Sequence, residues 1–375
     1  MVKKLKNTYD KICTLENLRL AHKNAKKDKA FYKEVKMVNS NEEYYLKQIQ
    51  DLLVKGEYII KESDYKISVI YDRIKSRTLM KLDYFPHRII QWWIMLQLSD
   101  MFMKCFSNFS CASIPNRWGK LAMKLMDKYM EDKKWTAYCL KLDIKKFYPS
   151  INHSILKKLI RRKIADKKLL GLIDMIIDSH PWDKWIPIWS YLSQYLANYY
   201  LTFFDHWLKE ELRIKYVIRY MDDIVIFWES KEYLWDIFWK IKEYLDKELY
   251  LTIKPNYQVF PTSIRWVDFV GYRFFYWYRL LRKRTCKKFK KKLKHIKDKK
   301  DKKQFINYRE RASTNSYIGW LIHCNSYRLY SKYIAPIISS IQKYYFFIIG
   351  RKNKKKFRLY NKKLLRKKWK INYII

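Results

Sequence analysis

Apolar and polar positions alternate with a helical period over much of the first sixty residues. In TLENLRLAHKNAKK, Leu15, Leu18 and Ala21 share one face and lysines occupy the other, the arrangement of an amphipathic helix. Residues 66–84 differ, because they are rich in β-branched and aromatic residues and carry many Lys and Arg; we predict a basic hairpin or pair of strands there. A helix is expected from Pro86, since proline is tolerated in the first turn of a helix.

Apolar stretches in the middle of the chain end in acidic residues. YCLKLDI, within residues 136–151, has the composition of a strand and ends at Asp143 and Ile144. KYVIRYM and IVIFW are predicted to be two short strands separated by Asp222 and Asp223. The three acids therefore lie at the ends of predicted strands.

Helical periodicity occupies the segments between and after these strands. It runs throughout residues 152–179 and again over 193–212, where Ser193 is the expected N-cap. A helix in LWDIFWKIKEYLDKEL, a strand or tight hairpin in WVDFVGYRFF and a lysine-rich helical region from Arg279 onward complete the pattern. This order predicts an α+β fold around an antiparallel sheet.

Charge narrows the class of partner. Lys and Arg number 81 against 36 Asp and Glu, a net charge of +45 in 375 residues. Such a surplus favours a polyanion, with nucleic acid first and an anionic membrane surface second. Hydrophobic residues make up 49% and aromatic residues 18% of the chain, so a disordered basic tail is excluded.

Neither secretion nor a membrane span is expected. The N-terminus MVKKLKNTYD lacks an apolar signal core, and the six cysteines contain no C-x-x-C pair, which favours reduced thiols in a cytosolic protein. The longest apolar stretch, Tyr333 to Gly350, is broken by Gln342 and Lys343. It is predicted to be an amphipathic packing helix.

Asp143, Asp222 and Asp223 are the candidate catalytic groups. An Asp-Asp pair is also a common turn, but a third acid at the end of a neighbouring strand would bring three carboxylates to one sheet edge. Mg²⁺ prefers such oxygen ligands. Two ions about 3.5–4 Å apart can activate a hydroxyl and stabilise a leaving oxygen, so nucleotidyl transfer or phosphodiester hydrolysis is predicted.

Five motifs in this chain resemble those of the reverse transcriptase palm, in order and spacing. They are LDIKKFYPSI (142–151), IPIWSYLSQ (186–194), YMDD (220–223), LTIKP (251–255) and FVGY (269–272). The resemblance implies a right-hand polymerase, with N-terminal helices and fingers over 1–130, a palm over 131–278 and a basic helical thumb over 279–375. A helical finger insertion is expected around 152–185.

Two further features resemble the reverse transcriptases of diversity-generating retroelements. They are the Ser193-Gln194 ending of the second motif and SYIGWLIHCNSYRL (316–329). The resemblance implies low-fidelity copying of a template-repeat RNA into cDNA by a bacterial or phage-encoded cytoplasmic enzyme. Its partners would be the RNA template, a DNA or RNA primer, dNTPs and a small basic accessory protein. The alternatives are a defence-associated or group II intron type of reverse transcriptase, and a catalytically impaired nucleic-acid binder.

The resemblance also assigns roles to residues. Asp143 and Asp222 would be the principal ligands of two Mg²⁺ ions, for which Mn²⁺ can substitute, with Asp223 and the backbone carbonyl of Ile144 completing the site. Lys254 matches a lysine placed to protonate departing pyrophosphate, although one lysine in so basic a chain carries little weight unaided.

The remaining assignments concern substrates. Tyr148 matches the aromatic residue beneath the incoming sugar, and a core aromatic is its alternative. Ile188 stands where many reverse transcriptases have a glutamine that bonds near the nascent base pair, so discrimination should fall. The other expected contacts are Gln194 and Tyr220 for the nucleotide, Lys75, Arg77 and Arg88 for the triphosphate, and Phe269, Gly271 and Tyr272 for the primer end.

Tryptophan is abundant where glycine is expected. The chain has 15 tryptophans and 6 glycines, whereas usage of about 7% would give roughly 26 glycines. Five tryptophans occupy glycine-like places of the family pattern, with Trp135 and Trp277 as weaker cases; the five are Trp182, Trp185, Trp189, Trp228 and Trp266. Either they are real tryptophans that pack or stack on bases, or UGA codons read as glycine by the source organism were translated as tryptophan.

Overall fold

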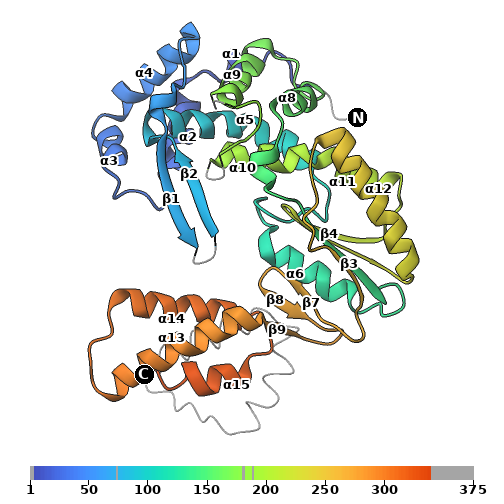
Figure 1. The fold of residues 1–375 in the computed structure, drawn as a ribbon. Coiled ribbons are helices and arrows are strands. Elements are labelled where there is room, and N and C mark those ends of the chain that lie inside the picture. Colours follow the sequence, from blue (N-terminus) through green and yellow to red (C-terminus); the bar gives the residue numbers. More distant parts are fainter. Residues whose placement is uncertain (1–3, 73–74, 180–181, 188–189, 339–375) are drawn as a thin grey trace, which may run out of the picture. The chain divides into compact units, whose positions relative to one another are not determined.

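The computed structural model describes residues 4–72, 75–179, 182–187 and 190–338, apart from the side chains of residues 70–78. The chain divides into two compact units, Met1–Leu125 with Lys134–Pro261, and Met126–Lys133 with Thr262–Ile375. Each unit contains helices and an antiparallel sheet (Figure 1), which confirms the predicted α+β class.

A four-stranded antiparallel sheet in the order β4-β5-β3-β6 is the centre of the first unit. Its strands are β3 (Tyr138–Asp143), β4 (Tyr216–Tyr220), β5 (Asp223–Trp228) and β6 (Gln258–Pro261). The β-branched residues of β4 and β5 are buried, whereas the aromatic residues at the strand ends, Tyr216, Tyr220 and Trp228, are half-buried. The helix α12 (Lys231–Leu249) packs against β3, β5 and β6 (Figure 1). The two strands predicted around Asp222 and Asp223 are confirmed.

The predicted basic hairpin is also confirmed. Strands β1 (Lys66–Asp72) and β2 (Lys75–Lys81) pair antiparallel as a separate two-stranded sheet, with Lys66 opposite Lys81. The chain then continues through η2 (Tyr84–Arg88) into the helix α5 (Ile89–Cys105), close to the start predicted at Pro86.

The other helices of this unit are short, and several of them begin with a side-chain cap. They are α1 (Tyr9–Ile12), α2 (Leu15–Ala25), α3 (Lys33–Ser40), α4 (Glu42–Lys55), η1 (Glu62–Asp64), α6 (Trp118–Tyr129), α7 (Phe147–Ser150), α8 (His153–Arg161), α9 (Lys167–Asp178), α10 (Tyr191–Tyr200) and α11 (Thr202–Glu210). Polar side chains accept N–H groups at the starts of α2, α4, α8, α9, α10 and α12. These bonds satisfy donors that have no partner within the helix.

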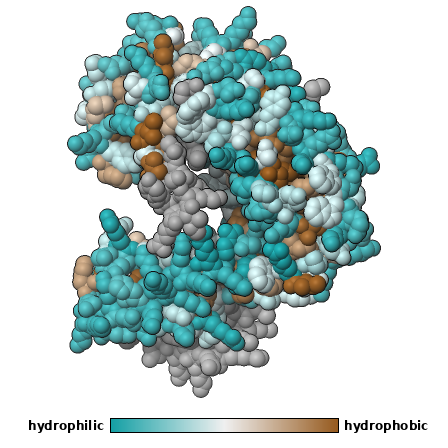
Figure 2. All heavy atoms as spheres, viewed as in Figure 1, coloured by the Kyte–Doolittle hydropathy of each residue, from teal (hydrophilic) through white to brown (hydrophobic). Residues whose placement is uncertain are grey.

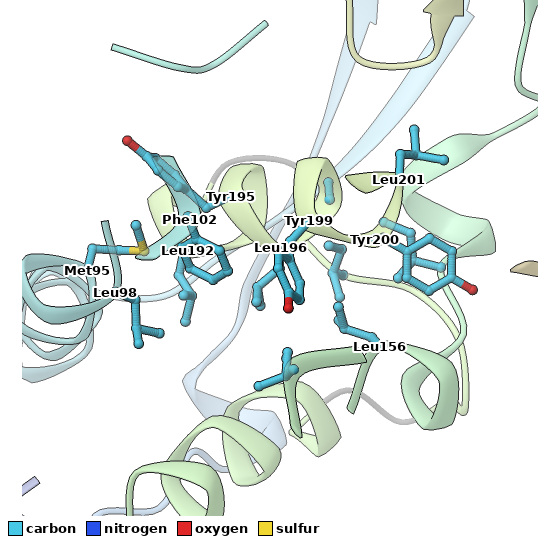
Figure 3. Close-up of a cluster of buried hydrophobic side chains, with 14 of the residues drawn as sticks. Met95, Leu98, Phe102, Leu156, Leu192, Tyr195, Leu196, Tyr199, Tyr200 and Leu201 are labelled. Carbon is cyan, nitrogen blue, oxygen red and sulfur yellow. The ribbon is translucent and has the colours of Figure 1, made fainter. Parts of the chain in front are cut away.

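Helix α10 is the most enclosed element of the core. Eight of its ten residues are buried, and its tyrosines and leucines pack between Phe102 of α5 and Leu156 of α8 (Figure 3). Its three buried tyrosines are hydrogen-bonded: Tyr199 donates to the Leu159 carbonyl and Tyr200 to the Leu249 carbonyl, at 3.2 and 2.7 Å, and the Tyr195 hydroxyl accepts from that of Tyr191 at 3.3 Å. An aromatic helix can therefore be buried without leaving polar atoms unpaired.

Two helix predictions were wrong in detail. The helix expected over 193–212 begins at Tyr191, is capped by Ser190 rather than Ser193, and is interrupted at Leu201. The continuous helical spacing over 152–179 belongs to two helices, α8 and α9, because Asp166 caps a new helix. A side chain that accepts a hydrogen bond from a backbone N–H can begin a helix at any point where the apolar spacing is also helical.

The second unit contains a three-stranded antiparallel sheet and a helical segment. Its elements are β7 (Val267–Phe269), β8 (Tyr272–Phe274), β9 (Arg279–Leu281), α13 (Lys283–Asp301), α14 (Tyr308–Leu321), α15 (Tyr327–Leu329) and η3 (Tyr330–Ile334). The expectation of helix from Arg279 onward was wrong at its start, since β9 pairs with β8 there. Figure 2 shows hydrophilic side chains over α13 and α14 on the face drawn.

The apolar stretch from Tyr333 to Gly350 lies mostly outside the described residues, so its predicted amphipathic helix stays a prediction. Among the helices that the structure describes, none has the length and apolar character needed to cross a bilayer.

Candidate active site at the edge of the four-stranded sheet

The register of the central sheet brings the predicted catalytic acids to one edge. Asp143, the last residue of β3, pairs with Asp223, the first residue of β5. Asp222 belongs to the two-residue loop between β4 and β5, and its carbonyl accepts the N–H of Ile144 at 3.1 Å. Met221 has a φ of +59° in this loop, a conformation that tight hairpin turns require. The turn therefore projects Asp222 toward the end of β3.

Lys254 lies directly against this acid pair. Its backbone N–H donates to the Asp143 carbonyl at 2.8 Å, and Ile253 forms a bridge with Ile144. The Lys254 Nζ donates to Asp143 Oδ1 and lies 3.9 Å from Asp222 Oδ2. Backbone pairing with the chain beyond β3 thus fixes the ammonium group between the two carboxylates.

The two carboxylates strongly affect each other. Enclosure by the surrounding protein and the neighbouring Asp143 carboxylate raise the pKa of Asp222 to about 7, although 37% of the side chain remains accessible. The Lys254 ammonium opposes this rise. Two neighbouring carboxylates repel each other when both are charged, and a bound cation removes that repulsion. The carboxylate oxygens of Asp143 and Asp222 are therefore suitable ligands for a divalent ion such as Mg²⁺.

Asp223 has a different neighbour. Its Oδ2 lies 3.6 Å from Nζ of Lys141, the residue two positions before Asp143 on β3. Within the described ranges, no three Asp, Glu, His or Cys side chains converge as a group that could hold a metal ion. The structure therefore brings Asp143 and Asp222 together with Lys254, and the participation of Asp223 stays a prediction.

Tyr148 packs against the acidic turn. The residue lies in α7, and its hydroxyl donates to Met221 Sδ at 3.9 Å. Burial, and then the charge of Asp222, raise the pKa of the Tyr148 phenol, so it stays protonated. Tyr220 ends β4 with its side chain half-buried, and Gln194 lies in α10, where its carbonyl accepts from the Asn198 amide at 3.3 Å.

The predicted triphosphate and fidelity residues are only partly described. Ile188 lies outside the described residues, as do the side chains of Lys75 and Arg77 in β2. Arg88 ends η2, where burial lowers the pKa of its guanidinium, and its Nε is a buried donor with no partner among the described residues.

The predicted primer contacts belong to the hairpin of β7 and β8 in the second unit. Gly271 has a φ of +87°, and a Cβ there would collide with the indole of Trp320. Glycine is therefore required at this turn for both conformation and space. The Tyr272 hydroxyl donates to the Trp320 carbonyl at 3.0 Å, so α14 holds this hairpin in place.

Sequence reasoning missed a buried polar network behind the acidic turn. Arg219 of β4 is fully buried and forms a two-pronged ion pair with Asp205, at 2.7 and 2.6 Å. It also donates to the Met221 carbonyl at 3.0 Å, to Asn198 Oδ1 at 3.2 Å and to Ser110 Oγ at 2.8 Å. An arginine inside the apolar strand YVIRY was the available signal, because a buried cation requires a partner.

This sheet, with paired acids and a lysine at one edge, is typical of a polymerase palm that transfers nucleotides. Residues 71–274, more than half of the chain, match the family model for reverse transcriptase (RNA-dependent DNA polymerase). The chain therefore belongs to the reverse transcriptase family, and it is an RNA-directed DNA polymerase. No curated protein matches it.

Proposed function

We propose that this reverse transcriptase is of the diversity-generating retroelement type and copies a template-repeat RNA into cDNA with low fidelity. The support for this type is the Ser193-Gln194 ending, the resemblance of residues 316–329 and the aliphatic Ile188. The convergence of Asp143, Asp222 and Lys254 at one sheet edge is the observation that carries the polymerase chemistry.

The proposed architecture is a right hand. The fingers would lie within residues 1–130, the palm within 131–278 with a helical insertion around 152–185, and the thumb within 279–375. The partners would be the template RNA, a primer, dNTPs and a small basic accessory protein, in the cytoplasm of a bacterium.

Asp143 and Asp222, with Asp223 and the Ile144 carbonyl, would hold two Mg²⁺ ions, and Mn²⁺ could substitute. When bound, such ions activate the primer hydroxyl and stabilise charge on the leaving oxygen. Lys254 Nζ already lies within reach of both carboxylates, so it can balance their charge and give a proton to the departing pyrophosphate. Tyr148, packed against the turn, would form the floor beneath the sugar and exclude a 2′-hydroxyl.

Primer extension on a defined RNA tests the catalytic proposal. We expect Mg²⁺-dependent cDNA synthesis by the unaltered chain and none by Asp222→Asn. Asp236→Asn is the matched control, because Asp236 is an exposed acid of α12 that pairs with Lys240 on the same helix. Equal synthesis by both variants would contradict the assignment. No synthesis by the unaltered chain would favour a nucleic-acid-binding relative.

Sequencing the cDNA from the same reactions tests the proposed low fidelity. Ile188→Gln restores a side chain that can hydrogen-bond, so its products should contain fewer errors. An error rate equal to that of the unaltered chain would exclude Ile188 as the cause, and a low error rate in both would favour the defence-associated or group II intron types.

A further inference from the structure

The turn between β8 and β9 is made entirely of aromatic residues, Phe275, Tyr276, Trp277 and Tyr278, which we call the aromatic turn. Tight turns usually contain Gly, Asn, Asp or Pro. Here the Phe275 N–H donates to the Tyr278 carbonyl at 2.9 Å, and the two rings stack with centroids 4.6 Å apart. Trp266 extends this surface, its ring 5.9 Å from that of Phe275. The rings are therefore ordered by the fold.

The aromatic turn is exposed at its tip. Trp277 is 74% accessible and Tyr278 is 40% accessible. Exposure of a tryptophan is unfavourable, because burying its large apolar side chain would stabilise the protein. Lys133 Nζ lies 4.3 Å from the centroid of the Trp277 ring, which orients the indole while most of it stays accessible.

Cations accompany these rings. The Arg273 guanidinium and the Lys283 ammonium lie 5.2 and 4.8 Å from the Trp266 centroid. Residues 262–284 contain a single acid, Asp268, and six cations: Arg265, Arg273, Arg279, Arg282, Lys283 and Arg284. Two of the six are neutralised, because Arg282 pairs with Asp268 and the buried Arg279 pairs with Asp127. Lys133 follows two acids, Glu131 and Asp132, which offset its charge. The positive charge of this surface therefore comes from residues 262–284.

We propose that the aromatic turn binds single-stranded nucleic acid, with bases stacked on Trp277 and Tyr278 and phosphates near Arg273 and Lys283. Accessible rings combined with a basic neighbourhood are how proteins hold single strands without regard to sequence. A duplex hides the faces of its bases, and an apolar protein partner would gain nothing from the adjacent cations. All these residues belong to the second unit and lie outside the acidic site. The surface is thus an additional contact for template or product.

Binding of a labelled 12-nucleotide oligo(dT), compared with an abasic oligonucleotide of equal length, separates stacking from charge. Fluorescence anisotropy without dNTPs or divalent ions makes the measurement independent of catalysis. Trp277→Ala should weaken oligo(dT) binding by about fivefold or more, the effect of losing one stacked base, and leave abasic binding unchanged. The matched control is Trp239→Ala, because Trp239 of α12 is 55% exposed and also lies beneath a lysine, Lys242 at 4.9 Å. This variant should bind both oligonucleotides as the unaltered chain does.

An unchanged affinity in Trp277→Ala, or an equal loss for both oligonucleotides, would overturn the proposal. Photocrosslinking of the unaltered chain to 5-iodouracil oligonucleotides gives a readout that needs no variant. We expect the crosslink in the peptide that contains residues 274–279, and its absence there would be equally decisive against the proposal.

Discussion

Arg219 shows how much one buried residue can determine at this site. Its guanidinium has no access to water and is surrounded by Asp205, Asn198, Ser110 and the Met221 carbonyl. Burial raises the pKa of Asp205, and Arg219 opposes that rise. Because the Met221 carbonyl belongs to the loop that carries Asp222, the ion pair also fixes the backbone of the acidic turn.

Removing the charge of Asp205 should therefore be costly. Asp205→Asn leaves the Arg219 charge buried without its counter-ion, so the free energy of unfolding should fall by about 3–5 kcal/mol. Asp236→Asn, which breaks an exposed pair with Lys240, should leave the free energy of unfolding nearly unchanged, because solvent screens exposed pairs. Urea unfolding measures both, and similar midpoints for the two variants would contradict the stabilising role of the buried pair.

The tryptophans at glycine-like positions do not behave alike. Trp185 has a φ of +96°, a region that bulky residues avoid. Trp228, in contrast, lies within β5 and stacks on Tyr233 with centroids 4.4 Å apart. Trp189 lies outside the described residues. Backbone conformation thus favours glycine at 185, and packing favours tryptophan at 228.

A pair of substitutions at Trp185 tests that distinction. Both Trp185→Gly and Trp185→Ala remove the indole, but only glycine adopts this φ without strain. The free energy of unfolding of Trp185→Gly should therefore be higher by about 1 kcal/mol. At Trp228 the order should reverse, because glycine weakens a strand. Urea midpoints of the four variants measure this, and alanine more stable than glycine at both positions would exclude strain at 185.

At the scale of elements, His22 connects three helical segments. It lies on α2 with no accessible surface, its Nε2 is 3.0 Å from Asn39 Oδ1 of α3, and Tyr84 of η2 approaches Nδ1 at 2.8 Å. A neutral ring that donates from Nε2 and accepts at Nδ1 satisfies both bonds. Burial is the main cause that lowers the pKa of His22.

Acid should therefore loosen this helical cluster. Above about pH 6.5 the histidine is neutral in both folded and unfolded chains. As pH falls below that value the unfolded chain takes up a proton first, so stability decreases by up to about 1.4 kcal/mol per pH unit until the folded-state pKa is reached. The difference in urea midpoint between pH 7.5 and 5.5 should shrink in His22→Gln. It should persist in His295→Gln, which alters an exposed residue of α13; an equal change in both would contradict the role of His22.

At the scale of the whole molecule, the net charge of +45 governs encounter with nucleic acid. Each neutralised phosphate releases counter-ions, so affinity for single strands falls steeply as salt rises. With about four such contacts, affinity for a mixed-sequence single-stranded RNA should drop more than tenfold between 50 and 200 mM salt. An uncharged morpholino oligonucleotide of the same sequence is the control. A salt-independent affinity for the RNA would show that charge does not drive binding.

Much of the fold could be predicted because its signals are local. The strand compositions of 138–143 and 223–228, the hairpin at 66–81 and the helix over 234–249 all follow from hydrophobic period and turn chemistry. Errors arose where a cap competed with an apolar period, as at Ser190 and Asp166. Where the apolar period allows a helix to begin at more than one residue, the side chain that caps the backbone N–H groups decides which residue begins it. The apolar period alone does not show which side chain that is.

The sequence by itself determined the α+β class, the family motifs and the placement of acids at the ends of strands, since these depend on residues close together in the chain. Only the tertiary structure decided that Lys254 lies on Asp143, that Asp223 faces Lys141 and that Arg219 is buried against Asp205. The first two of these pairs join residues distant along the chain, and the third joins the helix α11 to the strand β4. Their geometry depends on strand register and helix packing, which no local pattern specifies.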